Sequence, residues 1–184
     1  MLLCISGGLA GWVRAGAQTL PDASLARGTL AFDAKATLGP FTGVTSTVTG
    51  RLTGAAALSG VRGWVEAPAK SLTTSNGHRD RDMAGSLEIA KYPVIRFDLD
   101  GVTPGEVRGD STAVTLRGRF TIHGQTRDAS VPGWVWLRVN GARFRGALPM
   151  NVKDYGVGGL SKMLGVLKMN ETIIVRIDVE FANK

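Results

Sequence analysis

The densest group of side chains that could do chemistry lies in the segment 76–82. Two arginines and two aspartates alternate there, directly after an asparagine and a histidine. Arginine fits the oxygens of a phosphate through paired hydrogen bonds, so Asn76, Arg79 and Arg81 are candidates for contacting the polar head of a ligand. The same segment suits the start of a helix, because an acidic side chain in a first turn favours the helix dipole. We favour the structural role and keep head-group contact as the alternative.

Other catalytic arrangements are sparse. His78 and His123 are the two histidines, and neither belongs to a metal-binding pattern such as paired histidines on a helix. No nucleophile elbow and no phosphate-binding loop of the usual pattern occurs. The carboxylate pairs at 98/100 and 178/180 alternate outward on their strands. We therefore predict no enzyme activity, no metal and no cofactor. A histidine buried in a cleft against a carboxylate would instead favour a small enzyme with a pocket at the barrel mouth.

The elements that must position these residues are strands. From Ile173 to Phe181, and again over 30–36, 114–122 and 144–150, apolar side chains alternate with polar or small ones. A period of two with opposite polarity on the two faces is typical of antiparallel sheet covered on one side. About eight such strands are expected, the number at which a closed barrel can hold one small ligand. The sequence thus predicts an all-β, antiparallel barrel.

Turns and short helices are expected to interrupt the alternation. Asn140-Gly141 lies between two strand patterns and predicts a tight hairpin. Apolar residues recur at helical spacing over 79–91, before Tyr92-Pro93, and over 158–168. We therefore expect one or two short helices that cap a barrel mouth or lie over its side.

The first seventeen residues differ from the rest. Leu2 to Val13 is mostly apolar, and Ala15-Gly16-Ala17 has the small-x-small pattern of a signal-peptidase site. Residues 1–17 are predicted to be a signal peptide and 18–184 a single domain, which is expected to be periplasmic or secreted. An apolar tail that is not cleaved is the alternative. Cys4 is the only cysteine, so the mature domain would have no disulfide and no thiolate nucleophile.

Three stretches resemble the YceI-like family. Ser75–Leu99 contains an asparagine, a paired Arg-Asp, a helical pattern and then Tyr-Pro-Val-Ile-Arg-Phe. Leu116–Pro132 and Asp154-Tyr155-Gly156 match two further motifs at the right spacing, and the resemblance runs from about Arg27 to Ala182. It implies a lipocalin-like barrel, usually exported in bacteria, that binds a polyprenyl chain or a quinone tail in its interior. The chain departs from the family pattern at Asp82, where histidine is common.

The predicted function is therefore non-enzymatic binding, transport or storage of a long isoprenoid lipid. Such a chain has no polar groups along its length, so only apolar burial can hold it. The side chains expected to point inward and line the ligand are Leu30, Phe32, Phe41, Val65, Ala67, Ile95, Phe97, Leu116, Phe120, Val131, Val135, Phe144, Leu148, Val175, Ile177 and Val179. Glycines expected inside the barrel favour a cavity by thinning its wall, at positions Gly63, Gly118, Gly133 and Gly146.

Other interpretations stay open at this point. The same side chains could fill the barrel and leave no cavity. An eight-stranded outer-membrane barrel also alternates, but it turns its apolar face outward, and Trp64, Trp134 and Trp136 are too few for two aromatic belts. The net charge is +7, yet Arg117 and Arg119 lie on the opposite strand face from Phe120, which argues against nucleic-acid binding. No stable membrane span is expected, and a homodimer is an open alternative.

Overall fold

The structure, a computed structural model, describes residues 20–158, 161–162 and 167–183; the predicted signal peptide lies outside them. The long strands are β1 (Ala23–Ala36), β5 (Val94–Arg108), β6 (Ser111–Ile122), β7 (Gln125–Arg138), β8 (Gly141–Asn151) and β11 (Thr172–Asn183). The short ones are β2 (Gly39–Thr45), β3 (Thr49–Thr53), β4 (Arg62–Pro68), β9 (Ser161–Lys162) and β10 (Leu167–Lys168). Helical elements are α1 (Gly77–Ser86) and the 3-10 turns η1 (Leu58–Gly60), η2 (Ala69–Ser71) and η3 (Val152–Tyr155).

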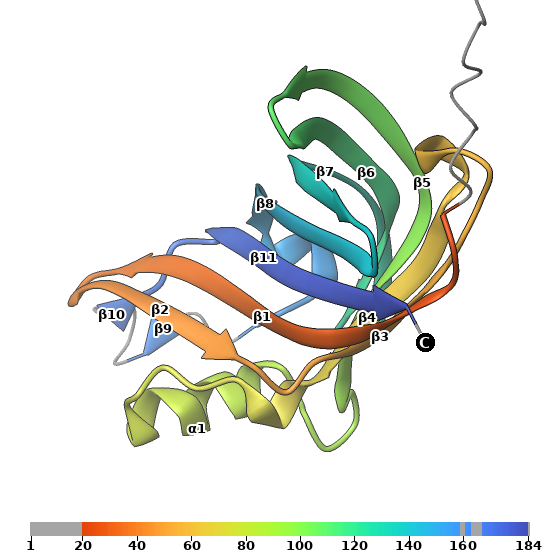
Figure 1. Cartoon of the computed structure of the whole chain (residues 1–184). Coiled ribbons are helices and arrows are strands. Elements are labelled where there is room, and N and C mark those ends of the chain that lie inside the picture. The colour runs from red at the N-terminus through yellow and green to blue at the C-terminus, as the bar shows by residue number, and fades with distance from the viewer. Residues whose placement is uncertain (1–19, 159–160, 163–166, 184) are drawn as a thin grey trace, which may run out of the picture.

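Eight strands form a closed antiparallel ring (Figure 1). Neighbours follow the order β11-β8-β7-β6-β5-β4-β3-β1, and β1 then pairs with β11 to close the sheet. Three strands pair with β1. β3 pairs with its start, β11 with most of its length, and β2 with Leu30–Ala36. β2 is a ninth strand outside the ring. The predicted eight-stranded, lipocalin-like antiparallel barrel is confirmed.

The two faces of each strand have opposite environments, as the alternation predicted. Phe97, Leu99 and Phe120 are buried within one apolar cluster. On the outer face, Asp178 accepts hydrogen bonds from Arg143 and Arg145 at 2.7–3.0 Å. These contacts, led by the Arg143 guanidinium, hold the pKa of the Asp178 carboxyl below its ordinary value. Apolar side chains thus face inward and charges face water, the reverse of an outer-membrane barrel.

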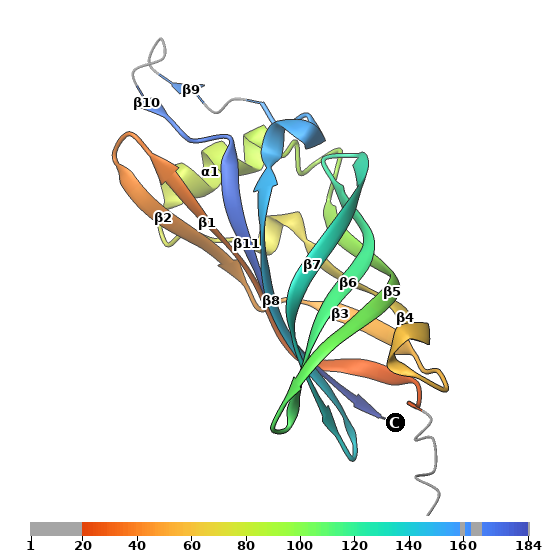
Figure 2. The same cartoon turned by 90° about the horizontal axis from the view of Figure 1, so that it is seen from above.

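Helix α1 lies across one end of the barrel, and the β5–β6 and β7–β8 turns lie at the other end (Figure 2). Asn76 begins the helix, because its side-chain oxygen accepts hydrogen bonds from the backbone N–H groups of His78 and Arg79, both at 3.1 Å. Asp80 occupies the first turn, where a negative charge favours the helix dipole. The helix ends before Tyr92-Pro93, as predicted, although earlier than the apolar spacing suggested.

Two sequence-based expectations need correction. A second helix over 158–168 is wrong for the described residues, because β9 and β10 pair there as antiparallel strands; the residues between them lie outside the described part of the chain. The β7–β8 hairpin exists, but its two turn residues are Val139 and Asn140, and Gly141 already belongs to β8. A pattern of spacings cannot separate helix from hairpin when tertiary pairing decides the outcome.

The inward glycines do not simply leave open space. A methyl group added at Gly118 would lie 2.0 Å from the Asp98 carbonyl oxygen and 2.8 Å from the Phe97 ring. The Phe144 ring covers Gly133 and Gly146 in the same way, at 2.7 and 2.5 Å from the added carbon. Each of these three glycines therefore lets an aromatic ring pack directly against the strand.

Replacement of Gly118 tests this packing. We expect Gly118→Ala to lower the free energy of unfolding by about 1–3 kcal/mol, because the added methyl forces the Phe97 ring and the neighbouring strand apart. Gly85→Ala is the matched control: nothing lies near an added methyl there, and alanine favours the helix by about 0.5–1 kcal/mol. Urea unfolding of both variants measures the difference, and equal stabilities would contradict the packing.

Candidate functional site

The barrel interior contains two compartments. The larger, of about 470 Å³, lies at the α1 end, and the smaller, of about 120 Å³, lies at the opposite end. The larger one falls in the size range of small-molecule sites, about 300–1,000 Å³. The interior is therefore hollow, so a barrel filled by its own side chains is excluded by the geometry.

A belt of four side chains lies between the two compartments. These residues contact both spaces and come from β1, β5, β6 and β11: Leu30, Ile95, Phe120 and Ile177. All four are apolar. Thr45, which lies opposite Leu30 in the sheet register, also lines the larger compartment, and its hydroxyl is already hydrogen-bonded to the Ser71 hydroxyl at 2.7 Å.

The charged groups of the larger compartment, with several of its polar ones, gather at its outer end. Asn76, His78, Arg79 and Asp82 reach it from the start of α1. Thr37 and Lys168 reach it from the β1–β2 hairpin and from β10. The compartment thus has an apolar depth and a mixed, partly charged mouth, which suits a ligand with a long apolar tail and one polar end.

Most of the predicted lining residues face one of these compartments. Four lie in the belt, and Phe32, Phe41, Ala67 and Val175 line the larger compartment. Val65, Phe97, Leu116, Val135, Phe144 and Val179 line the smaller one. Val131 and Leu148 are buried but line neither space. Whether any of them contacts a ligand stays a prediction.

The three predicted head-group residues separate in the structure. Arg79 lines the larger compartment, and its guanidinium carbon lies 4.2 Å from the centre of the Phe41 ring, a cation–π contact. Asn76 also lines it, but its side-chain oxygen caps α1. Arg81 is exposed and lines neither compartment. Arg79 is therefore the predicted residue whose charge is best placed at the mouth.

Asp80 has a structural role beside this mouth. Its carboxylate accepts hydrogen bonds from the Thr74 hydroxyl at 2.6 Å, the Thr73 hydroxyl at 2.8 Å and the Thr74 N–H at 2.7 Å. These contacts hold the pKa of the Asp80 carboxyl below its ordinary value. Thr73 in turn pairs with Val44 of β2. Asp80 thus ties the first turn of α1 to the barrel wall.

His123 is the histidine that lies against a carboxylate. Its Nε2 lies 2.6 Å from a carboxylate oxygen of Glu88, its Nδ1 lies 3.1 Å from the Tyr155 carbonyl, and its side chain is only 13% exposed. The ring nevertheless lines neither compartment. The contact joins the segment after α1 to the β6–β7 turn and to η3. It braces the end of the barrel rather than facing a substrate space.

Several lining residues escaped the sequence analysis. Met83 and Leu87 of the α1 segment, and Tyr155 of η3, also line the larger compartment. Burial raises the pKa of the Tyr155 hydroxyl, with the charge of Asp154 adding to the effect. The helical spacing of Met83 and Leu87 was a usable signal, because it marks an apolar face that must cover something. Nothing in the local sequence indicates that this face covers a cavity.

The described residues lack both a cluster of metal-binding side chains and a helix that could span a membrane. No three His, Cys, Asp or Glu side chains there lie together as metal ligands would. No helix in that part of the chain has the length and apolar character needed to cross a bilayer.

Comparison with known families identifies the fold. The model of the YceI-like domain matches residues 22–181, which is nearly all of the described chain. The protein belongs to the YceI-like family. The resemblance seen in the three sequence motifs is thereby confirmed. No curated protein matches the sequence.

Solved structures agree with this YceI-like assignment. A polyisoprenoid binding domain from Saccharophagus degradans has a TM-score of 0.74 and 18% identity, covering 90% of this chain and 99% of its own. BcnA of Burkholderia cenocepacia has a TM-score of 0.71 and 16% identity over 83% of this chain and 95% of its own. The Campylobacter jejuni YCEI protein has a TM-score of 0.54 and 17% identity, covering 67% and 72%. At such identities the likeness establishes the shared fold.

The hydrogen bonds that Asp80 accepts from Thr73 and Thr74 should make the stability of the protein depend on pH. Because folding lowers the pKa of this carboxyl, its contribution to stability is fully present above about pH 4, the range of an unfolded aspartate, and is lost as pH falls through the lower folded value. Asp80→Asn should therefore melt below wild type at pH 7, and the difference should be smaller at pH 3. Asp128→Asn on β7 is the control. A gap in melting temperature between Asp80→Asn and wild type that is the same at both pH values would contradict this role.

Proposed function

We propose that this YceI-like protein binds a long isoprenoid lipid, of polyprenyl or quinone type, in the larger compartment and carries or stores it without chemical change. The observation that carries the proposal is the shape of that compartment: an apolar depth closed by the belt, and a mouth with charged groups. A ligand with one polar end and a long hydrocarbon tail matches both parts.

Apolar burial supplies enough energy for such a ligand. At about 0.8 kcal/mol for each buried methylene-sized group, one isoprene unit contributes roughly 3–4 kcal/mol before losses of entropy. The compartment of about 470 Å³ accommodates about fifteen such groups, if each takes about 30 Å³, the share of a water molecule in the liquid. About three isoprene units would therefore fit between the belt and the mouth.

The family supports isoprenoids over other apolar ligands. One member of this fold is described as a polyisoprenoid binding domain, and its structure covers 90% of this chain. Much of the compartment wall is branched and aliphatic, with Leu30, Val175 and Ile177 among its residues, which suits a methyl-branched chain. Lipid type, transport and storage are parts of this proposal.

Arg79 is the residue that we propose for the polar end of the ligand. It reaches the mouth from α1 while its guanidinium lies over the Phe41 ring, so the side chain is held in place before any ligand arrives. A fixed guanidinium can donate two parallel hydrogen bonds to a phosphate or a carbonyl group. Arg81 points elsewhere, and Asn76 already uses its side-chain oxygen to cap the helix.

We further propose that the protein is a carrier rather than an enzyme and that it is exported. The contact of His123 with Glu88 lies outside both compartments, so this pair would not meet a ligand there. Export rests on the apolar segment and the small-x-small pattern before Gln18.

Extraction of the native protein tests the function and the export together. Protein released from cells by osmotic shock should begin at Gln18, and its organic extract should contain a series of lipids whose masses differ by one isoprene unit. Mass spectrometry of the extract and N-terminal sequencing are the measurements. An extract containing only straight-chain lipids would refute the ligand class, and retention of residues 1–17 would refute the export.

A blocked compartment provides the matched variant. Ala67 is 2% exposed and faces the larger compartment, so Ala67→Phe should fill part of that space and reduce retained lipid at least tenfold. Ala147 lies exposed on the outer face of β8, and Ala147→Phe adds the same ring there without that loss. Lipid per protein, measured after loading and gel filtration, should separate the two variants; equal retention would contradict the proposed site.

The head-group role has its own test. Arg79→Gln should weaken binding of farnesyl diphosphate by about tenfold, the value of one charge-assisted contact, and should leave farnesol binding nearly unchanged. Arg81→Gln is the control and should affect neither ligand. Competition binding of both ligands to the three proteins is the measurement. Equal losses for farnesol and the diphosphate would show that Arg79 acts through packing on Phe41 alone.

A further inference from the structure

We infer that the apolar belt between the compartments limits the length of the lipid tail, with Phe120 and Ile177 as the residues that set the limit. This inference rests on the proposed function, because it assumes an isoprenoid in the larger compartment. It concerns which tail the protein prefers, which the fold and the family do not determine.

The four belt residues lie on opposite walls, Leu30 and Ile177 on one and Ile95 and Phe120 on the other, and a cross-strand pair marks each wall. Leu30 of β1 lies directly opposite Ile177 of β11 in the sheet register. Phe120 of β6 lies opposite Phe97 of β5, and their ring centres are 4.7 Å apart with planes at 43°. In the ring order, β8 and β7 separate the two pairs on one side, and β3 and β4 on the other. The pairs therefore meet across the barrel axis.

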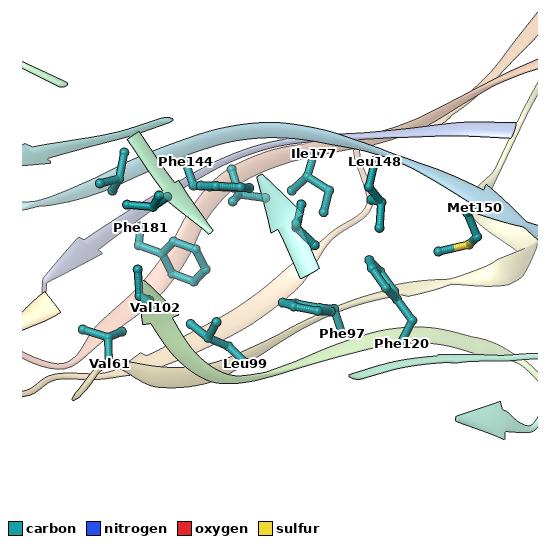
Figure 3. Packing of buried hydrophobic residues seen from close by; sticks show 14 of the residues in the cluster. Val61, Phe97, Leu99, Val102, Phe120, Phe144, Leu148, Met150, Ile177 and Phe181 are labelled. Carbon is teal, nitrogen blue, oxygen red and sulfur yellow. The ribbon is translucent and has the colours of Figure 1, made fainter. Parts of the chain in front are cut away.

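The close view of the core shows two of the belt residues, Phe120 and Ile177, on opposite walls (Figure 3). The Phe97 and Phe120 rings rise from one wall, and Ile177 and Leu148 point toward them from the other wall (Figure 3). Phe120 is 5% exposed and contacts both compartments, whereas Phe97 lines only the smaller one. Phe120 thus forms the face of the belt that an entering tail would meet first.

The volumes on the two sides define the expected preference. The larger compartment accommodates about fifteen carbon-sized groups at about 30 Å³ each. The smaller one, of about 120 Å³, accommodates about four on the same basis, which is close to one isoprene unit. A tail of three units would fill the larger space and stop at the belt. A fourth unit reaches an apolar space only if the belt opens.

Competition between two prenyl alcohols measures this limit. The full-length mature protein is loaded from an equimolar mixture of fifteen-carbon farnesol and twenty-carbon geranylgeraniol, passed through gel filtration and analysed by mass spectrometry. The wild type should retain the two within about threefold of each other, because the fourth unit remains at the mouth. Phe120→Leu should favour geranylgeraniol by about tenfold or more, since an additional isoprene unit is then buried.

Two other variants keep the test decisive. Ile177→Ala opens the belt from the opposite wall and should shift the ratio in the same direction, even if Phe120→Leu folds poorly. Phe181→Leu is the matched control: Phe181 is also 5% exposed, but it lines only the smaller compartment. It makes the same exchange without opening the belt, so its ratio should equal that of the wild type. Circular dichroism confirms that each variant is folded.

Different results would refute the proposed function and the proposed length limit. If the wild type retains neither alcohol, the proposed function fails. If the wild type retains both alcohols and already favours geranylgeraniol tenfold, the tail passes the belt and the length limit is refuted. A ratio that shifts equally in Phe120→Leu and Phe181→Leu also refutes it, because general loosening of the core then explains the change.

Discussion

The pairing of β1 with β11 is the constraint on which the molecule depends. These strands come from the two ends of the domain, and they pair from Ala23 opposite Asn183 to Asp33 opposite Ile174. Without that pairing the eight strands would form an open sheet with two free edges and an apolar face in contact with water. Closure turns the same face inward, so that one apolar surface becomes both the core of the fold and the wall of the compartments.

The interior of a closed eight-stranded barrel is narrow, so the size of the inward side chains determines where free space remains. At Gly118, Gly133 and Gly146 the missing side chain lets a phenylalanine ring lie against the wall. At the belt, pairs of large side chains meet from opposite strands and divide the interior. Packing that stabilises the barrel therefore also determines where a ligand would find room. The residues that hold the fold together and those that face the compartments are largely the same set.

At the mouth end of the barrel, most polar groups make hydrogen bonds that hold the structure together. Asp80 holds α1 to the loop before it, Asn76 caps the same helix, and His123 links Glu88 to η3. A buried or half-buried polar group that lacks a partner is costly, so these contacts stabilise the end of the barrel. Arg79 differs in that its guanidinium lies over an aromatic ring while the side chain lines the larger compartment.

The alternation of residues was enough to predict strands, their inward faces and the antiparallel barrel, because a period of two assigns each side chain to one face whatever the fold around it. The same local logic predicted that Asp80 lies in the first turn of a helix, whereas the cap formed by Asn76 was not predicted. Pairing partners far apart in the chain decided the rest. The strands β9 and β10 pair where a helix was expected, Val131 and Leu148 are buried but line neither compartment, and of Arg79 and Arg81 only Arg79 lines one. The division of the interior arises because Leu30 and Ile177 of β1 and β11 face Ile95 and Phe120 of β5 and β6 across the barrel, and no short stretch of sequence contains that information.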